Sequence, residues 1–470
     1  MKQIICTVAA ALILTACGDS APDKPLPLGW LHVEDGRIVD EANREIILRG
    51  MNARIEGLFD VVFADGRTRL EPIPTFSQND AEEMADVGIN FLRLPINWSG
   101  LEPEEGEFNL DYLAQIDEVV EHCRNAGIYV LIDFHQDAYS KELGEDGAPY
   151  WAILPQAEFT HEGPLEDLDE RRGSPQVLDA FENFFDNAEG IMDRFMPAVE
   201  MVAARYASDS TVLGYEIMNE PVAFHATDGI NKLYSFYSQV TQTIRAVDAK
   251  HTIWMEPDAS RNFLLVSDAP NGFEDPNIVY TPHMYPPFSD TETWDSAKWI
   301  EELTYTYDRM MKEKQDWGAA LVLGEWGANP RWEGSIPYIR ASHSIFNARL
   351  MGQTFWLWKE NCQGFWGLYD RNEDEDTWTL NEQAAKEVGQ PTVHAAPGIF
   401  KSLGFDPESS RLTAEIETGE AGWAQLFLPT RWYTDQAVGT LNGEPLDLIP
   451  LENNRYEALI PSGNHTLVVE

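Results

Sequence analysis

The sequence has few basic residues for its size. It holds 33 lysine and arginine residues against 79 aspartate and glutamate residues, a formal net charge of -46 over 470 residues. A protein that binds nucleic acid neutralises phosphates with clustered basic side chains, and this sequence contains no run of Lys or Arg. Nucleic acid is therefore not an expected partner, and the acidic surplus is expected to form a solvated surface.

Cysteine is also scarce. Of the four cysteines, Cys6 and Cys17 lie near the N-terminus, while Cys123 and Cys362 are far apart in the chain. This pattern excludes a disulfide framework and a C-x-x-C metal site, and leaves open whether Cys123 and Cys362 pair. The G-x-S-x-G elbow of serine hydrolases is absent too. We expect no cofactor.

Apolar and aromatic residues, in contrast, are plentiful. Hydrophobic residues make up 43% of the chain and aromatic residues 11%, with 15 tryptophans. Such a chain has enough apolar surface for a folded core, and its flat aromatic faces suit ligand binding. Its length indicates one large domain with a smaller one.

The N-terminus has the pattern of an export signal. The apolar segment Ile4–Leu14 is too short to span a bilayer and is typical of a secretory signal peptide. The following LTAC, Leu14–Cys17, resembles the lipobox of bacterial lipoproteins, which implies cleavage before Cys17 and acylation of that cysteine. An ordinary cleaved signal with an incidental cysteine is the alternative. We expect a signal peptide over residues 1–16 and a lipid anchor with a polar spacer over residues 17–28.

The resulting location is outside the cytoplasm in either case. Gly18 after the cysteine is compatible with sorting to the outer membrane or the periplasmic face. We therefore expect an exported, membrane-anchored lipoprotein. The sequence leaves its oligomeric state open.

Residues 29–394 alternate apolar runs with amphipathic segments. Continuous apolar runs suit strands that are buried on both faces, and about eight of them separated by helices predict a (β/α)8 TIM barrel. The strand-like runs begin at Glu45, Ile89, Ile128, Thr211, Thr252, Asn277, Ala320 and Gly352. The helical patterns cover Gln78–Val87, Leu110–Asn125, Pro175–Tyr206, Lys232–Ala246, Ser296–Lys314 and Ile336–Met351.

The pattern changes over residues 395–470. Short strand-like runs are separated there by Gly, Asn and Pro, without helical patterns, and Asn442-Gly443 is a strong turn signal. We expect a small C-terminal antiparallel β-sandwich that braces the barrel.

Polar residues end several of the predicted barrel strands. The stretch GYEIMNEP, Gly214–Pro221, begins as a core strand and ends on Asn219 and Glu220. In a (β/α)8 barrel the carboxyl ends of the strands form the active-site rim, so such residues are expected to converge on one cleft. The residues at predicted strand ends are Arg93, Asp133, His135, Asp137, Asn219, Glu220, His283, Tyr285, Glu325, Trp326, Trp356 and Trp358.

This set favours glycoside hydrolysis. Two carboxylates across a cleft can cleave a glycosidic bond, one as proton donor and the other as nucleophile. Glu220 and Glu325 are the preferred pair, and Glu256 in MEPD ranks behind them. Asn219, beside Glu220, is suited to bind a sugar 2-hydroxyl, and Tyr285 is suited to keep Glu325 ionised.

Aromatic and histidine side chains complete the expected site. Trp356 or Trp358 is suited to form a stacking platform for a sugar ring. Asp133, His135 and Asp137 have no second histidine at ligand spacing nearby, so we expect no metal.

Three motifs at the strand ends, MNEP, HMY and GEWG, resemble glycoside hydrolase family 5, whose clan carries both catalytic glutamates at strands four and seven. The resemblance implies that Glu220 is the acid/base, that Glu325 is the nucleophile, and that a covalent glycosyl-enzyme retains the configuration. The family's strand-eight tryptophan corresponds to either Trp356 or Trp358, since residues two apart face the same side of a strand. The implied supporting residues are Arg93, His135, Asn219, His283 and Tyr285.

A narrower resemblance lies in DFHQDAYS, Asp133–Ser140, and GEDGAPYWA, Gly144–Ala152. These segments are similar to the endoglycoceramidase branch, which cleaves between glycan and lipid. The resemblance implies that Asp133 binds sugar and that a glycolipid or another β-glycoside is the substrate. The stretch Gln136–Pro175 is too long for an ordinary connection and is expected to form a lid or an acyl-chain wall.

One departure from the endoglycoceramidase pattern leaves the identity of the bound sugar open. The branch is expected to carry a sugar-contacting lysine after RGxN, but here RGMNAR, Arg49–Arg54, is followed by Ile55, Glu56 and Gly57. A β-glucosidase acting on ceramide or steryl glucosides is therefore an alternative, as is a β-glucan endoglucanase with an open groove. A sugar-binding lipoprotein without catalysis is a further alternative, which the intact glutamate pair disfavours.

Overall fold

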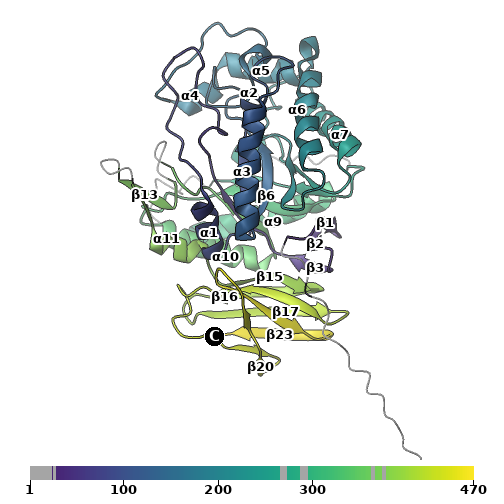
Figure 1. Ribbon diagram of the computed structural model, residues 1–470, viewed down its shortest axis with the longest axis vertical. Coiled ribbons are helices and arrows are strands. Elements are labelled where there is room, and N and C mark those ends of the chain that lie inside the picture. The colour runs from purple at the N-terminus through teal and green to yellow at the C-terminus, as the bar shows by residue number, and fades with distance from the viewer. Residues whose placement is uncertain (1–23, 25–27, 265–272, 286–294, 361–365, 373–376) are drawn as a thin grey trace, which may run out of the picture.

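The computed structural model consists of a barrel with a β-sandwich packed at its lower end (Figure 1). Cys17 and Cys362 lie outside the described residues, whereas Cys123 is a buried free thiol. The described residues are 24, 28–264, 273–285, 295–360, 366–372 and 377–470.

Eight parallel strand positions close into a ring, which confirms the predicted (β/α)8 barrel. The ring closes where β12 pairs with β4 and where the sixth position pairs with β11. The sixth position consists of two short strands separated by Thr281 and Pro282. The strands are β4 (Arg49–Asn52), β5 (Phe91–Ile96), β6 (Tyr129–Phe134), β7 (Val212–Glu216), β8 (Thr252–Met255), β9 (Ile278–Tyr280) with β10 (His283–Met284), β11 (Ala320–Trp326) and β12 (Gly352–Phe355).

Burial on both faces explains the continuous apolar runs. Every residue of β5, β6, β7 and β11 is buried, because one face lines the barrel and the other packs against helices. Arg93, Asp133, Glu216 and Glu325 are the charged residues within these strands, and because they are buried they need partners of opposite charge inside the barrel.

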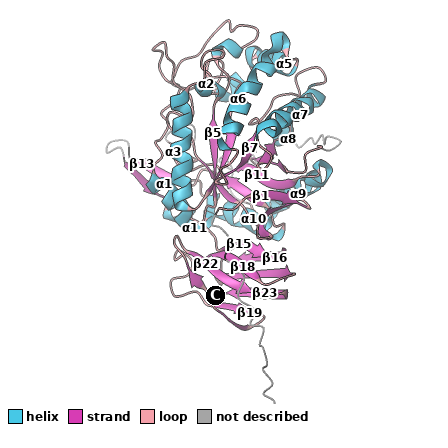
Figure 2. Ribbon diagram, turned by 45° about the vertical axis from the view of Figure 1, so that its right-hand side comes forward, coloured by secondary structure: helices cyan, strands magenta, loops and turns pink. Residues whose placement is uncertain are grey.

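Helices surround the strands, as Figure 2 shows in cyan. In α3, Asn109 accepts backbone hydrogen bonds at the start, and Gly127 ends the helix at a positive φ of 69°. Leu113 and Ile116 on its inner face pack into the barrel core. The main helices are α1 (Gln78–Asp86), α3 (Leu110–Ala126), α5 (Pro175–Phe185), α6 (Ile191–Tyr206), α7 (Gly229–Val247), α9 (Ser296–Trp317) and α10 (Ser335–Ala348), and shorter ones are α2 (Trp98–Leu101), α4 (Leu168–Arg172), α8 (Ser260–Leu264) and α11 (Glu382–Val388).

The single helix expected over Pro175–Tyr206 is wrong, because two helices cover this range. Asn187, Glu189 and Gly190 all have positive φ, so the chain leaves the helical conformation between α5 and α6. The apolar periodicity on either side of the break is similar, which is why the sequence pattern alone did not separate the two helices.

Strands from both ends of the chain build the sandwich. One sheet has the order β1-β2-β3-β15-β18-β22-β21 and the other β16-β17-β23-β19-β20. The N-terminal strands therefore pair with the C-terminal domain, Ile46 facing Ala395, and the boundary expected at residue 395 falls inside β15. The strands are β1 (Leu31–Glu34), β2 (Arg37–Asp40), β3 (Arg44–Ile46), β15 (Thr392–Pro397), β16 (Ile399–Asp406), β17 (Arg411–Thr418), β18 (Gly422–Phe427), β19 (Gly439–Leu441), β20 (Glu444–Leu446), β21 (Ile449–Pro450), β22 (Arg455–Ile460) and β23 (Gly463–Val469), apart from a separate hairpin of β13 (Tyr369–Asn372) and β14 (Thr377–Leu380).

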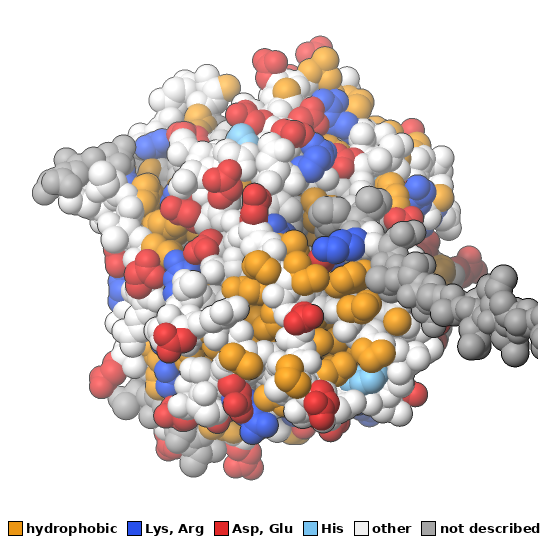
Figure 3. All heavy atoms as spheres, turned by 60° about the horizontal axis from the view of Figure 1, so that its bottom comes forward, with side chains coloured by type: hydrophobic (Ala, Val, Ile, Leu, Met, Phe, Trp, Pro, Cys, Tyr) orange, Lys and Arg blue, Asp and Glu red, His pale blue; other side chains and the backbone are white. Residues whose placement is uncertain are grey.

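The sandwich is fixed to the barrel by polar contacts. Arg431 binds the Asp86 carboxylate at 2.9 Å, and the indole of Trp432 donates to the Lys386 carbonyl at 2.8 Å. These contacts fit the expected bracing role. Toward the sandwich end, Figure 3 shows hydrophobic side chains grouped among acidic ones. Within the described part of the chain, no helix combines the length and the apolar character needed to cross a bilayer.

Candidate active site

The two candidate catalytic glutamates meet at the mouth of the barrel. Glu325 lies in β11, directly opposite His283 of β10 in the strand register, and Glu220 follows β7. One carboxylate oxygen of each glutamate and one ring nitrogen of His283 lie within 4.8 Å of one another. Retaining glycosidases hold their two carboxyl groups about 5–5.5 Å apart, so this spacing suits a nucleophile and an acid/base.

A tight turn presents Glu220. Its φ is 39°, in the left-handed region that residues other than glycine seldom adopt. The Gln136 side chain donates to the carbonyl of Asn219 at 2.7 Å and to that of Glu220 at 3.1 Å, while the Asn219 amide donates to the Gln136 carbonyl at 3.0 Å. Gln136 thus fixes the turn that carries Asn219 and Glu220.

Arg93 organises the floor of the site and is fully buried. Its guanidinium bonds the carboxylate of Glu216, the Glu325 Oε1 at 2.6 Å and the Asn219 Oδ1 at 2.9 Å, and it lies 3.1 Å from the Asp133 Oδ2. Burial alone would lower the pKa of Arg93, but the surrounding carboxylates raise it well above its ordinary value. Arg93 is therefore a permanent cation that holds Glu325 and Asn219 in place.

Both oxygens of Glu325 have a donor. Arg93 occupies Oε1, and the Tyr285 hydroxyl donates to Oε2 at 2.7 Å. Burial, together with the Glu325 charge, raises the pKa of Tyr285 well above its ordinary value, so the hydroxyl keeps its proton. The two donors fix the orientation of the carboxylate, as an attacking group requires.

His283 links three glutamates. Its Nδ1 lies 3.0 Å from the Glu220 Oε1 and 3.5 Å from the Glu325 Oε2, and its Nε2 lies 3.1 Å from the Glu256 Oε1. Burial alone would lower the pKa of His283, but the charges of Glu256 and Glu325 and the hydrogen bond with Glu220 raise it well above its ordinary value. The imidazole is therefore protonated in the free protein.

The protonated imidazole lowers the pKa of both glutamates beside it, but at Glu256 burial outweighs this effect. Burial alone would raise the pKa of Glu220, but the hydrogen bond and the charge of His283 bring it below its ordinary value. Burial raises the pKa of Glu256 to about 8 although His283 opposes that change. In the free protein the mobile proton next to Glu220 thus resides on His283.

The two candidate tryptophans face different environments, so the expectation that both face the same side is wrong. The half-buried Trp356 ring stacks beside His135, with ring centres 6.1 Å apart and planes inclined by 15°. Trp358 is buried, its indole donates to the Asp80 carboxylate at 3.0 Å, and its ring packs on Tyr369. Because β12 ends at Phe355, strand alternation does not extend to either tryptophan.

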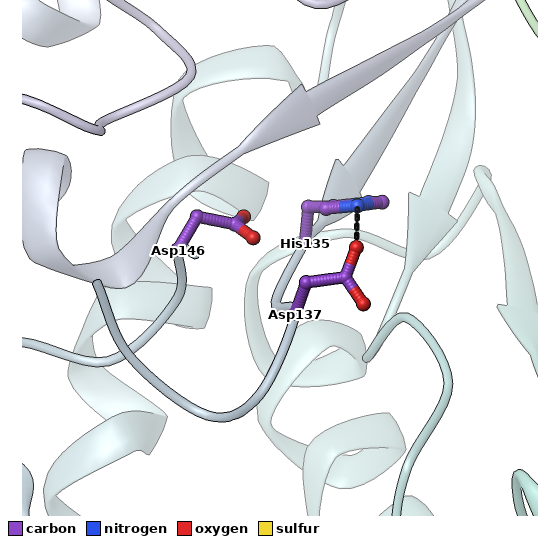
Figure 4. Close-up of side chains that lie close together, drawn as sticks. All are labelled: His135, Asp137 and Asp146. Carbon is purple, nitrogen blue, oxygen red and sulfur yellow. Dashed lines mark ion pairs between the residues drawn. The ribbon is translucent and has the colours of Figure 1, made fainter. Parts of the chain in front are cut away.

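His135 lies among carboxylates on the same side of the mouth as Trp356. Its Nδ1 lies 2.7 Å from Asp133, and its Nε2 lies 3.9 Å from Asp137, the ion pair drawn in Figure 4 with Asp146 nearby. Burial alone would lower the pKa of His135, but the charges of Asp133 and Asp146 raise it well above its ordinary value. Arg172 binds Asp137 at 2.7 Å, so His135, Asp133, Asp137 and Arg172 form an ion-pair network.

Three residues that position the site were not predicted from the sequence. Gln136, Glu216 and Asn52 all contact the residues above, and Asn52 accepts from Arg93 at 3.1 Å. A charged residue inside an apolar strand, such as Glu216, was a detectable signal, because a buried charge needs a partner. Gln136 carried no such signal, since its role depends on how the long segment after β6 folds back.

Comparison with known proteins agrees with this geometry. The family model for cellulases of glycosyl hydrolase family 5 matches residues 39–362. Endoglycoceramidases from Cyanea nozakii and Hydra vulgaris are 28% and 30% identical to the chain over 279 and 280 residues, which are 53% of this chain and 54% and 53% of those proteins. The chain thus spans about half the length of these curated relatives.

A solved structure is similar to this protein over nearly the whole chain. Endo-glycoceramidase II from Rhodococcus sp., in complex with a cellobiose-like imidazole, superposes with a TM-score of 0.77 at 25% identity and covers 92% of this chain and 98% of that one. The strand-end glutamates lie within the region that the family model matches. The chain belongs to glycoside hydrolase family 5.

Proposed function

We propose that the protein hydrolyses the β-glycosidic bond between a sugar and a lipid aglycone, with retention of anomeric configuration. The observation that carries this proposal is the close pairing of Glu220 and Glu325, whose carboxylate oxygens lie within 4.8 Å in different environments. Glu325 has two fixed donors, and Glu220 contacts a protonated imidazole. Such unequal environments assign different roles to two carboxyl groups.

In the first step Glu325 attacks the anomeric carbon. Arg93 and Tyr285 orient the carboxylate, so little reorganisation is needed when the covalent bond forms. Asn219 has one amide hydrogen on the Gln136 carbonyl, and the other is available to the sugar 2-hydroxyl. This contact strengthens as the transition state develops positive charge on the sugar.

Glu220 transfers a proton to the departing oxygen. Because its own pKa is low in the free protein, the proton reaches Glu220 from His283 along the 3.0 Å hydrogen bond. After the lipid leaves, Glu220 is a carboxylate and takes a proton from the water that hydrolyses the glycosyl-enzyme. That proton passes back to His283 along the same hydrogen bond and restores the free protein.

Exposed apolar side chains on the segments that follow two barrel strands support a lipid aglycone. Tyr150, Phe159 and Phe224 have exposed fractions of 47%, 72% and 54%, and they lie on the loops after β6 and β7. Phe224 follows Glu220 by four residues, and its backbone N–H donates to the Asp258 Oδ2 at 2.9 Å. Exposed large apolar side chains near a catalytic group favour an apolar ligand portion, and the relatives with endoglycoceramidase names agree with it.

Product analysis tests this function. The leader-free protein is incubated with glucosylceramide, lactosylceramide, a steryl glucoside and a soluble β-glucan, with Glu325→Gln as the inactive control, and products are identified by mass spectrometry. Release of free lipid with a sugar of retained configuration is expected. Cleavage of the β-glucan alone would contradict the lipid aglycone, and no cleavage at all would favour a sugar-binding protein.

We also propose that the protein is exported and held at a membrane by acylated Cys17. This residue lies outside the described chain, so the support comes from the LTAC motif and the apolar segment Ile4–Leu14. Lys24 pairs with Glu457 of β22, so the spacer meets the folded protein at the sandwich. Labelling with a radioactive fatty acid is expected to mark the wild type and not Cys17→Ser, and equal labelling of both would exclude this anchor.

A further inference from the structure

A second buried charge cluster lies beside the catalytic groups and takes no part in the steps above. The Arg54 guanidinium lies 2.5 Å from Glu71, 2.9 Å from Glu145 and 2.9 Å from Glu360. All four side chains have exposed fractions of 2–3%. One buried cation therefore holds three buried carboxylates, a set that is costly to assemble unless its geometry is maintained.

The cluster joins three separate loops. Arg54 and Glu71 belong to the loop between β4 and α1, Glu145 to the long segment after β6, and Glu360 to the segment after β12. We call these four side chains the Arg54 wall. The first two loops are also paired through their backbones, Gly163 to Thr68 at 2.8 Å and Leu165 to Leu70 at 2.7 Å.

Burial affects the ionisation of the carboxyl groups in the wall. Three buried carboxyl groups lie on the Arg54 guanidinium. Burial raises the pKa of Glu145 well above its ordinary value and that of Glu360 to about 7, although Arg54 opposes both changes. The cluster thus retains protons near neutral pH, which reduces repulsion among the carboxyl groups.

The Arg54 and Glu360 side chains of the wall come from strand positions distant from Glu220. In the ring of eight strand positions, β12, which precedes Glu360, is four positions from β7, and β4, which precedes Arg54, is three. Glu145 follows β6, the neighbour of β7, and reaches Arg54 from the long segment after that strand. The Arg54 guanidinium carbon lies 6.0 Å from the ring centre of Trp356. Glu360 also accepts the backbone N–H of Trp366 at 2.6 Å, and the Trp366 ring packs edge-on against Tyr285.

This placement limits the sugar portion of the substrate. The Arg54 guanidinium lies beside the Trp356 ring. We propose that the first sugar, whose leaving group departs on the side of Glu220, extends over Trp356 toward the Arg54 wall, and that the wall leaves no room for a second sugar, so that the enzyme takes lipids bearing a single β-linked hexose. This inference rests on the proposed function and names its substrate class.

Two pairs of substrates test it. Glucosylceramide is compared with lactosylceramide, and methylumbelliferyl β-glucoside with methylumbelliferyl β-lactoside, so that each pair differs by one sugar. The expected kcat/KM of each disaccharide substrate is lower by at least about 100-fold. Comparable kcat/KM within both pairs would overturn the wall while leaving the proposed function intact, and no cleavage of any of the four substrates would overturn both.

Variants of Arg54 test whether the wall is the cause. Arg54→Met is expected to reduce the discrimination between single-sugar and two-sugar substrates by about 10-fold or more, because three carboxylates lose their common partner. Arg54→Lys keeps the charge but not the forked geometry and is expected to be intermediate. Arg44→Met is the matched control, since it removes a buried arginine bonded to Asp40 at 2.7 Å at the other end of the barrel.

The measured quantity is the ratio of kcat/KM for the single-sugar substrate to kcat/KM for the two-sugar substrate, which general destabilisation does not change. If Arg54→Met does not fold, Arg54→Lys and the wild-type ratio still decide the question. A folded Arg54 variant that discriminates as strongly as the wild type would overturn the role of Arg54, as would an equal loss of discrimination in Arg44→Met.

Discussion

Removing the Tyr285 hydroxyl is the sharpest single-atom test of the nucleophile's environment. Tyr285 donates to the Glu325 Oε2 at 2.7 Å, and its ring centre lies 5.5 Å from that of Trp366. Tyr285→Phe therefore removes one hydrogen bond to a charged group and leaves the ring packing in place. Such a bond contributes about 1.5–3 kcal/mol. If that contribution is lost from the transition state, kcat/KM falls by roughly 10- to 150-fold.

The assay needs a control of the same chemistry elsewhere in the barrel. Tyr215 in β7 donates to the Asp248 Oδ2 at 2.8 Å, away from the mouth; it is buried, whereas Tyr285 is half-buried. Tyr215→Phe is expected to lower the melting temperature while leaving kcat/KM of the folded protein unchanged. A loss of less than about 2-fold in Tyr285→Phe, or an equal loss in Tyr215→Phe, would refute the assigned role of Tyr285.

Three further predictions follow from the same geometry. Glu325→Gln is expected to lower turnover by at least about 1000-fold with little change in the dissociation constant for substrate, and a near-normal rate would exclude Glu325 as the nucleophile. Burial raises the pKa of Glu256 to about 8, so its ionisation above pH 8 adds a negative charge 3.1 Å from the His283 Nε2 and holds the proton on that ring. Because Glu220 receives its proton from His283, kcat/KM is expected to hold up to about pH 8 and to fall above it. In Glu256→Gln the pH above which kcat/KM changes is expected to shift. If that pH is the same as in the wild type, the change belongs to another titrating group. Trp356→Ala is expected to raise KM by about 10-fold with little loss of stability. Trp358→Ala is expected to lower the free energy of unfolding by about 3–5 kcal/mol and to leave KM nearly unchanged. The reverse pattern of effects would contradict the placement of the two rings.

Much of the barrel was predictable because its strands are encoded locally. Continuous apolar runs mark strands buried on both faces, and Asn219, Glu220 and Glu325 stand out because charged or amide groups end or interrupt such runs. The chemistry of a glutamate pair follows from residue types at known strand ends. This part of the site needed no long-range information.

The remainder depends on contacts between distant segments. Ile46 pairs with Ala395, so the membership of β3 in the sandwich is invisible in either local pattern. The different settings of Trp356 and Trp358 follow from where β12 ends, which periodicity does not fix to one residue. Arg54 reads as a departure from a sugar-binding motif, and only the folded loops show that it holds three carboxylates.

The central claim is that Glu325 forms a covalent bond with the sugar. The most direct measurement is mass spectrometry of proteolytic peptides after incubation with 2,4-dinitrophenyl 2-deoxy-2-fluoro-β-glucoside, which slows hydrolysis of a glycosyl-enzyme. The account predicts one added fluorosugar on the peptide that contains Glu325 and none in Glu325→Gln. A label on Glu220 or Glu256, or rapid hydrolysis of the reagent with inverted configuration and no label, would contradict it.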